Sequence, residues 1–128
     1  MRNEELKNRT KKFSLRIIRL INSLPNNIAA KAIANQIVRS GMSVGANYRA
    51  ACLGRSKAEF IAKLGIVLEE VDECKFWLEI IVESEMLSKK KVENLHKESD
   101  ELTAIFYTMI KNLKTRKQTR QTLQTFQT

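Results

Sequence analysis

One run of apolar residues, in which steps of four and three alternate, constrains the fold of this chain more than any other feature. Its members are Phe60, Leu64, Val67, Val71, Cys74, Leu78 and Ile81. This spacing places all of them on one stripe of an α-helix, and a continuous stripe needs partner helices to cover it. The run predicts a helix over about residues 57–85, roughly eight turns long, inside a helical bundle.

The start of this helix is marked by a break and a cap. Gly54 can adopt the left-handed conformation that ends a preceding helix, and Ser56 with Glu59 forms an S-x-x-E capping box for the next one. We therefore expect a helical hairpin that turns at Gly54, with its first helix over about residues 28–53.

Two more helices are predicted, over about residues 4–24 and 89–114. The apolar stripes of the other three helices are Leu6, Phe13, Ile17, Leu20 and Leu24, then Ile33, Ile37, Val44, Tyr48 and Ala51, and last Val92, Leu95, Leu102, Phe106, Met109 and Leu113. Four helices joined by short turns must be antiparallel neighbours, so we predict an all-α, up-down-up-down four-helix bundle over residues 1–114. The Thr/Gln-rich tail, 115–128, has little core-forming power, and we expect it to be frayed or disordered.

Polar and small residues interrupt the first helix of this hairpin, which is the second predicted helix of the chain. Gly41 and Gly45 each cost about 1 kcal/mol relative to Ala inside a helix, which suggests that another backbone approaches there, within the bundle or between subunits. Ser40 and Asn47 lie on or beside the buried stripe, opposite the stretch that includes Glu70. We predict that Asn47 joins a polar contact across the hairpin, with a structural and not a catalytic role.

The charge is high and unevenly distributed. The formal net charge is +9, and residues 1–58 hold 12 basic and 2 acidic residues, whereas residues 59–101 hold 6 basic and 12 acidic ones. A bundle brings these parts together, which neutralises them in part and leaves a basic surface elsewhere. Such a surface favours polyanions through long-range attraction and counterion release.

The residues needed for catalysis or metal binding are nearly absent. His96, three residues after Glu93, is the sole histidine, so a di-iron site with two E-x-x-H motifs cannot form. Cys52 and Cys74 make no disulfide framework, and no spacing pairs either one with His96 as a nucleophile. No signal-peptide core and no apolar run of ~20 residues is present. We expect a cytoplasmic protein without enzymatic activity, metal, cofactor or membrane contact.

Three stretches of the hairpin resemble one protein family. They read S-V-G-A-N-Y-R-A-A from Ser43, R-S-K-A-E-F-I-A-K-L from Arg55, and E-E-x-D-E-x-x-x-W-L from Glu69. They are similar to the small four-helix-bundle proteins encoded in intervening sequences of bacterial 23S ribosomal RNA genes, and the resemblance covers about residues 5–115. The commoner family pattern N-I-A-E-G is replaced here by N-Y-R-A-A from Asn47, so an acidic residue is missing and Arg49 precedes its place.

The resemblance implies a left-handed antiparallel bundle that assembles into a homopentameric ring without established enzymatic activity. A distant branch of the family serves as the accessory protein of diversity-generating retroelements, where a basic pentamer is thought to bind nucleic acid and the reverse transcriptase. Our sequence-based hypothesis is a non-enzymatic, homo-oligomeric protein that binds nucleic acid, RNA in particular. The phosphate contacts would come from cations around the matching motif, namely Arg39, Arg49, Arg55, Lys57 and Lys63.

Two alternatives to this hypothesis stay open. Each of these cations could instead pair with acids of the third helix, within the chain or between subunits. The protein as a whole could be a structural oligomer or an adaptor for a protein partner, with a basic surface that only aids solubility.

Overall fold

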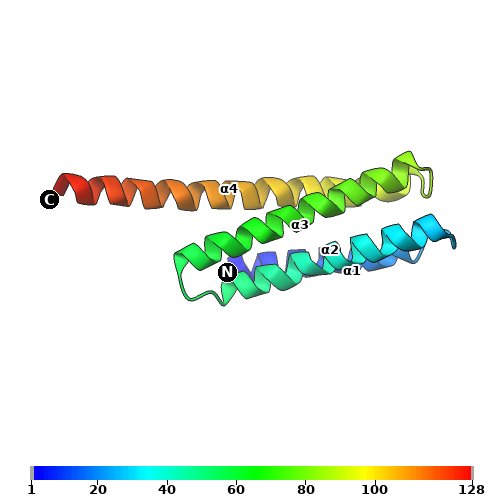
Figure 1. The fold of residues 1–128 in the computed structure, drawn as a ribbon, viewed down its shortest axis with the longest axis horizontal. Helices are drawn as coiled ribbons and strands as arrows, with labels where there is room; N and C mark the ends of the chain where they lie inside the picture. The colour runs from blue at the N-terminus through cyan, green and yellow to red at the C-terminus, as the bar shows by residue number, and fades with distance from the viewer. Residues whose placement is uncertain (1, 128) are drawn as a thin grey trace.

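The computed structural model describes the backbone of residues 2–127 and the side chains of residues 3–116. It contains the helices α1 (Arg2–Ile21), α2 (Ile28–Cys52), α3 (Lys57–Glu83) and α4 (Lys89–Gln127). Figure 1 shows them running antiparallel, with α2 packed between α1 and α3, and with α4 along the other side of α3. The predicted all-α four-helix bundle is confirmed.

Two helix ends differ from the predicted positions. Helix α1 ends at Ile21 rather than at Leu24, because Pro25 disfavours helical backbone for the residue before it. Residues 22–24 form tight turns, in which Ser23 N–H donates to Leu20 and Leu24 N–H donates to Ile21. Helix α4 continues to Gln127, beyond the predicted end at residue 114, and Figure 1 shows it extending past the turn between α2 and α3. The expected fraying of the tail stays a prediction, since the side chains from residue 117 onward lie outside the described residues.

The core follows the predicted stripes. Leu64, Val67, Val71, Cys74, Leu78 and Ile81 of α3 are fully buried, whereas Phe60 at the start of the run is half-buried. The fully buried side chains of the other helices that belong to the predicted stripes include Phe13, Ile17, Ile37, Val44, Tyr48, Leu102 and Phe106. Tyr48 of α2 packs its ring against Phe106 of α4, with centroids 5.5 Å apart, so side chains of these two helices meet in the core.

Among residues 3–116, three serine or threonine side chains are fully buried. Two of them, Thr10 and Ser99, occupy gaps in the apolar stripes of α1 and α4. Each bonds to a carbonyl oxygen of its own helix: Thr10 donates to Leu6 at 2.8 Å and Ser99 to His96 at 2.6 Å. A hydroxyl that is satisfied by its own helix can be buried without a partner on another helix. This explains why the stripes of α1 and α4 tolerate a polar position.

The turns depart from the predicted backbone geometry in one respect. Ser56 caps α3 as expected, accepting the Glu59 N–H at 3.1 Å. Gly54, however, does not adopt a positive φ, so the predicted left-handed conformation is wrong there. Within residues 2–127 the left-handed region is occupied instead by Glu85, with φ 62°, directly after the C-cap of α3.

The neighbouring helices of the bundle do not all pack against one another to the same extent. Helices α1 and α2 approach closely at Gly41, whose backbone lies against Ile17, and Ser14 donates a 2.7 Å hydrogen bond to the Gly41 carbonyl. The contact between α1 and α4 is the least extensive of the four sides. None of the helices that the structure describes combines the length and the apolarity required to span a bilayer.

Candidate nucleic-acid interface

Four of the five candidate phosphate ligands lie where α2 turns into α3. Arg49 belongs to the last turns of α2, Arg55 to the turn itself, and Lys57 and Lys63 to the first turns of α3. Arg49 and Arg55 are exposed, and the two lysines are half-buried. Within residues 3–116, none of the four forms an ion pair, although Glu59 accepts the backbone N–H of Arg55 at 3.2 Å. Their charges are therefore free to meet a polyanion.

Arg49 also belongs to a hollow between α1 and α2. The hollow measures about 330 Å³, and Lys7, Lys11 and Arg49 line it together with apolar side chains that include Leu15 and Met42. Lys7 contacts the exposed Glu4 at 3.2 Å, one turn away on the same helix. A surface ion pair of this kind contributes little free energy, so Lys7 remains available for another anion. The resulting surface joins three cations to exposed apolar atoms.

Arg39, the fifth candidate, is already neutralised. Its guanidinium bridges two acids of α3, at 3.3 Å from Glu70 Oε2 and in a shorter contact with Glu73. These hydrogen bonds, led by the one to Glu73, raise the pKa of Arg39. The alternative in which a candidate cation pairs with the acids of the third helix therefore applies to Arg39 in this chain.

Of the three residues predicted to make polar contacts across the hairpin, Ser40 and Glu70 do so and Asn47 does not. Asn47 Nδ2 donates to the Ser43 carbonyl at 2.9 Å, one turn back on α2, so Asn47 does not bridge the two helices. Ser40 does reach across, because its hydroxyl accepts a 3.3 Å hydrogen bond from the Cys74 thiol of α3. Glu70 reaches across through Arg39. Ser40, Arg39 and their partners thus form polar contacts between α2 and α3.

A network that the sequence analysis missed joins α1 to α4. Arg9 binds Glu98 through two hydrogen bonds, Nε to Oε2 at 2.9 Å and Nη2 to Oε1 at 2.8 Å, and its Nη2 also lies 2.6 Å from Glu101. The Glu98 side chain is 14% exposed, and the hydrogen bonds from Arg9 lower the pKa of its carboxyl. No local spacing could have revealed a pair separated by 89 residues.

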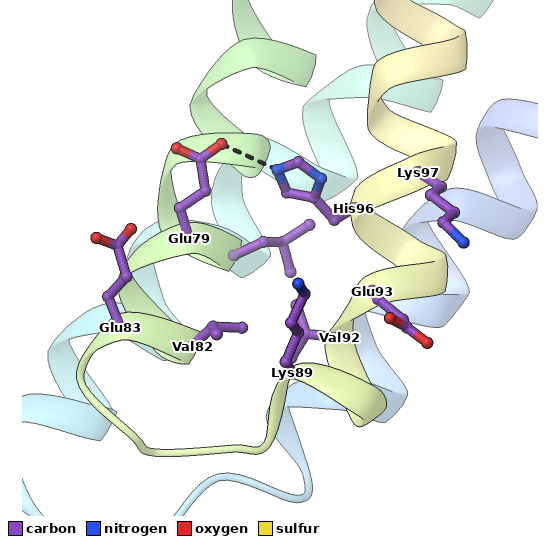
Figure 2. Close-up of a pocket in the computed structure, with 9 residues that line it drawn as sticks. Glu79, Val82, Glu83, Lys89, Val92, Glu93, His96 and Lys97 are labelled. Carbon is purple, nitrogen blue, oxygen red and sulfur yellow. Dashed lines mark hydrogen bonds and ion pairs between the residues drawn. The ribbon is translucent and has the colours of Figure 1, made fainter.

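The neighbourhood of His96 holds a further hollow, of about 340 Å³, between α3 and α4 (Figure 2). His96 Nε2 lies 2.9 Å from Glu79 Oε2, whereas the carboxylate of Glu93 turns away from the imidazole in Figure 2. Glu93 and His96 therefore do not converge on a common point. Over the residues whose side chains are described, no group of three His, Cys, Asp or Glu side chains could hold a metal ion.

The fold and these surfaces define a small, basic, antiparallel four-helix bundle with free cations at the α2–α3 end. The chain belongs to the family of 23S rRNA-intervening sequence proteins, whose family model matches residues 2–108.

A solved structure supports the same assignment. The chain is similar to a protein of unknown function from the S23 ribosomal protein family of Bacteroides thetaiotaomicron VPI-5482, for which a crystal structure at 1.70 Å resolution exists. The two share 35% sequence identity and superpose with a TM-score of 0.78, over 83% of this chain and 98% of the other. A comparison with curated protein sequences gives no match.

Proposed function

We propose that this protein is a non-enzymatic, homo-oligomeric nucleic-acid-binding protein that prefers RNA, with Arg49, Arg55, Lys57 and Lys63 as its phosphate contacts. The observation that carries the proposal is that these four cations make no ion pair in the described part of the chain, although the neighbouring α3 is rich in acids. Lys and Arg side chains in this state bind phosphates and release condensed counterions. The description of the family, which refers to 23S rRNA, favours RNA as the ligand.

Arg39 has a lesser role in this proposal. To contact a phosphate it would have to leave Glu70 and Glu73, and those two acids would then lose their partner. We therefore expect substitution of Arg39 to weaken RNA binding less than substitution of Arg55.

Self-association is supported by apolar side chains on the surface. Phe76 of α3 is 52% exposed and lies edge-on to Trp77, with ring centroids 5.0 Å apart, and Met42 of α2 is 53% exposed. Large apolar side chains of this kind often belong to interfaces between proteins. We propose a homopentamer as the assembled form, as the family resemblance implies. The same side chains favour the second candidate function, a structural oligomer or adaptor that binds no nucleic acid.

Charge reversal distinguishes the two candidates. The test variant is Arg55→Glu/Lys57→Glu, and the matched control is Lys31→Glu/Lys97→Glu, which changes the net charge equally at exposed positions without ion pairs. Filter binding to ribosomal RNA fragments and to DNA of matched sequence, over a salt series, gives the affinity and its salt dependence. The oligomeric mass is measured in the same buffers.

The RNA-binding proposal expects the test variant to lose at least tenfold in affinity at ~100 mM salt with its mass unchanged. The slope of log affinity against log salt should fall by about 1.5, the value for two phosphate contacts. The control should stay within a factor of about three. Equal losses in both variants, or no RNA preference at low salt, would contradict the proposal, and loss of assembly in the test variant would favour the structural oligomer.

A further inference from the structure

The seam between α1 and α4 changes its charge character along its length. Around Arg9 the charges match, because Glu98 and Glu101 of α4 accept hydrogen bonds from the guanidinium. Toward the end of α1 the match is lost. There α1 places Arg16 and Arg19 on the seam, and α4 places Asn94 and Lys91 opposite them.

These residues enclose a hollow. It measures about 350 Å³, and its lining is completed by Leu20, Ser23 and Leu95. No acidic residue lines it, and Arg16, Arg19 and Lys91 make no ion pair within residues 3–116. The floor includes the buried Leu95, while Arg16 is half-buried and Arg19 and Lys91 are exposed at the rim. An anion placed among the three cations is attracted by all of them.

Glu98, the acidic residue whose charge interacts with Arg16, is already bound by Arg9. Arg16 contributes to lowering the pKa of Glu98, but less than Arg9, whose two hydrogen bonds hold that carboxylate. Lys91 also follows Lys89 and Lys90 in a first helical turn that contains no acid. Three like charges thus line this part of the seam, and an anion bound among them would offset their mutual repulsion.

We propose that Arg16, Arg19 and Lys91 form a binding site for a phosphate group in the α1–α4 seam. Arginine side chains suit this ligand because their planar N–H groups match two phosphate oxygens, and the lysine adds a third donor. Ser23 and Asn94 bring further hydrogen-bonding groups to the edge of the hollow. The phosphate can belong to a small molecule or to a nucleic-acid backbone.

This site is separate from the interface proposed above. Figure 1 shows that the end of α1 and the start of α4 lie at one end of the bundle, and the α2–α3 turn lies at the other. The phosphate site therefore does not depend on RNA binding by Arg55 and Lys57, and either proposal can fail without the other.

The test measures thermal unfolding of the full chain in sodium phosphate and in sodium chloride of equal ionic strength. The seam variant is Arg16→Gln/Arg19→Gln/Lys91→Gln, and the control is Lys31→Gln/Lys97→Gln/Lys111→Gln, which removes the same charge from exposed positions. At a phosphate concentration ten times its Kd, bound phosphate should raise the Tm of the wild type and the control by about 5 °C over chloride. The seam variant should lose this rise, and the single variant Lys91→Gln should reduce it.

Equal rises in all proteins would overturn the proposal, because phosphate also stabilises proteins without binding to a site. A second arm identifies the source of the phosphate through RNA filter binding by the same variants. If the seam variant binds RNA more weakly than the control, the site takes a nucleic-acid phosphate. If the two bind RNA equally while the phosphate-dependent rise is lost, the site takes a small phosphate compound.

Discussion

The backbone of Gly41 in α2 lies against the side chain of Ile17 in α1, so closely that an added Cβ would stand 2.9 Å from Ile17 Cγ1 and 3.1 Å from Ile17 Cβ. Ile17 is fully buried and β-branched, so it has no free space into which it could rotate. The two helices can reach this distance because residue 41 has no side chain. The sequence left open whether the close approach at Gly41 lies within the bundle or between subunits. The structure shows a close approach within the bundle.

Substitution of Gly41 by Ala should therefore destabilise the protein. We expect a loss of about 1–2 kcal/mol in the free energy of unfolding, since overpacking outweighs the better helix propensity of Ala. Gly65→Ala is the matched control, because a Cβ added there meets no atom within 4 Å beyond the backbone of its own helix, and it should stabilise by up to about 1 kcal/mol. Urea unfolding of both variants checks the opposite signs, and two changes of the same sign would contradict the packing argument.

Glu85→Gly should stabilise the protein. Glu85 follows the C-cap of α3 with φ 62°, and the bonds from Glu85 N–H to Val82 and from Met86 N–H to Ile81 form a Schellman motif, in which Gly is preferred. Relief of the left-handed strain should add about 1 kcal/mol to the free energy of unfolding. Glu83→Gly, within the last turn of α3, is the control and should destabilise by a similar amount. Thermal and urea unfolding measure both effects.

The Arg9–Glu98 pair should stabilise the bundle at neutral pH and not in acid. Because Arg9 lowers the pKa of Glu98 in the folded state, the stabilisation is present above the unfolded pKa of about 4.3 and is lost as the pH falls through the folded value. Arg9→Met should cost about 1 kcal/mol at pH 7 and progressively less below pH 4. Urea unfolding of both proteins from pH 7 to pH 2.5 measures this. A cost that does not change with pH would show that Arg9 acts through its aliphatic packing.

The two cysteines should differ in reactivity. Burial raises the pKa of the Cys74 thiol to about 12, and that thiol donates to Ser40, whereas Cys52 is only half-buried. Because the thiolate is the reactive form, Cys74 in a Cys52→Ala variant should react at pH 8 on the order of a thousandfold more slowly in the folded protein than in urea. Alkylation followed by mass spectrometry measures the rates. Comparable rates in buffer and in urea would mean that α3 is not stably packed on α2.

Much of the fold could be predicted from local patterns. The α3 run from Leu64 to Ile81 is buried as the spacing predicted, and the Ser56 cap begins α3 at the predicted residue. The errors lie where several backbone solutions have similar energies. A helix can end on Gly54 without a positive φ, and the left-handed residue is Glu85, whose side chain does not indicate that conformation.

Less of the candidate sites could be predicted. Arg39, Arg49 and Arg55 belong to one basic group in the sequence, yet Arg39 alone of the three meets acids on the facing helix. Asn47 was expected to bridge two helices and bonds within its own. In both cases the bonding partner depends on the register of α2 against α3, and the composition of the chain does not determine that register.

The amino-acid sequence by itself determined that the chain forms four amphipathic helices, where their apolar stripes run, and that the molecule carries excess positive charge. These properties follow from periodicity, capping and composition, which act over one or a few helical turns. The tertiary structure alone decided that Arg9 meets Glu98, that Gly41 meets Ile17, and that Arg16 and Lys91 line the same hollow without an acidic residue. Each of these pairs depends on the register and separation of packed helices, which are set by the fit of all the buried side chains together.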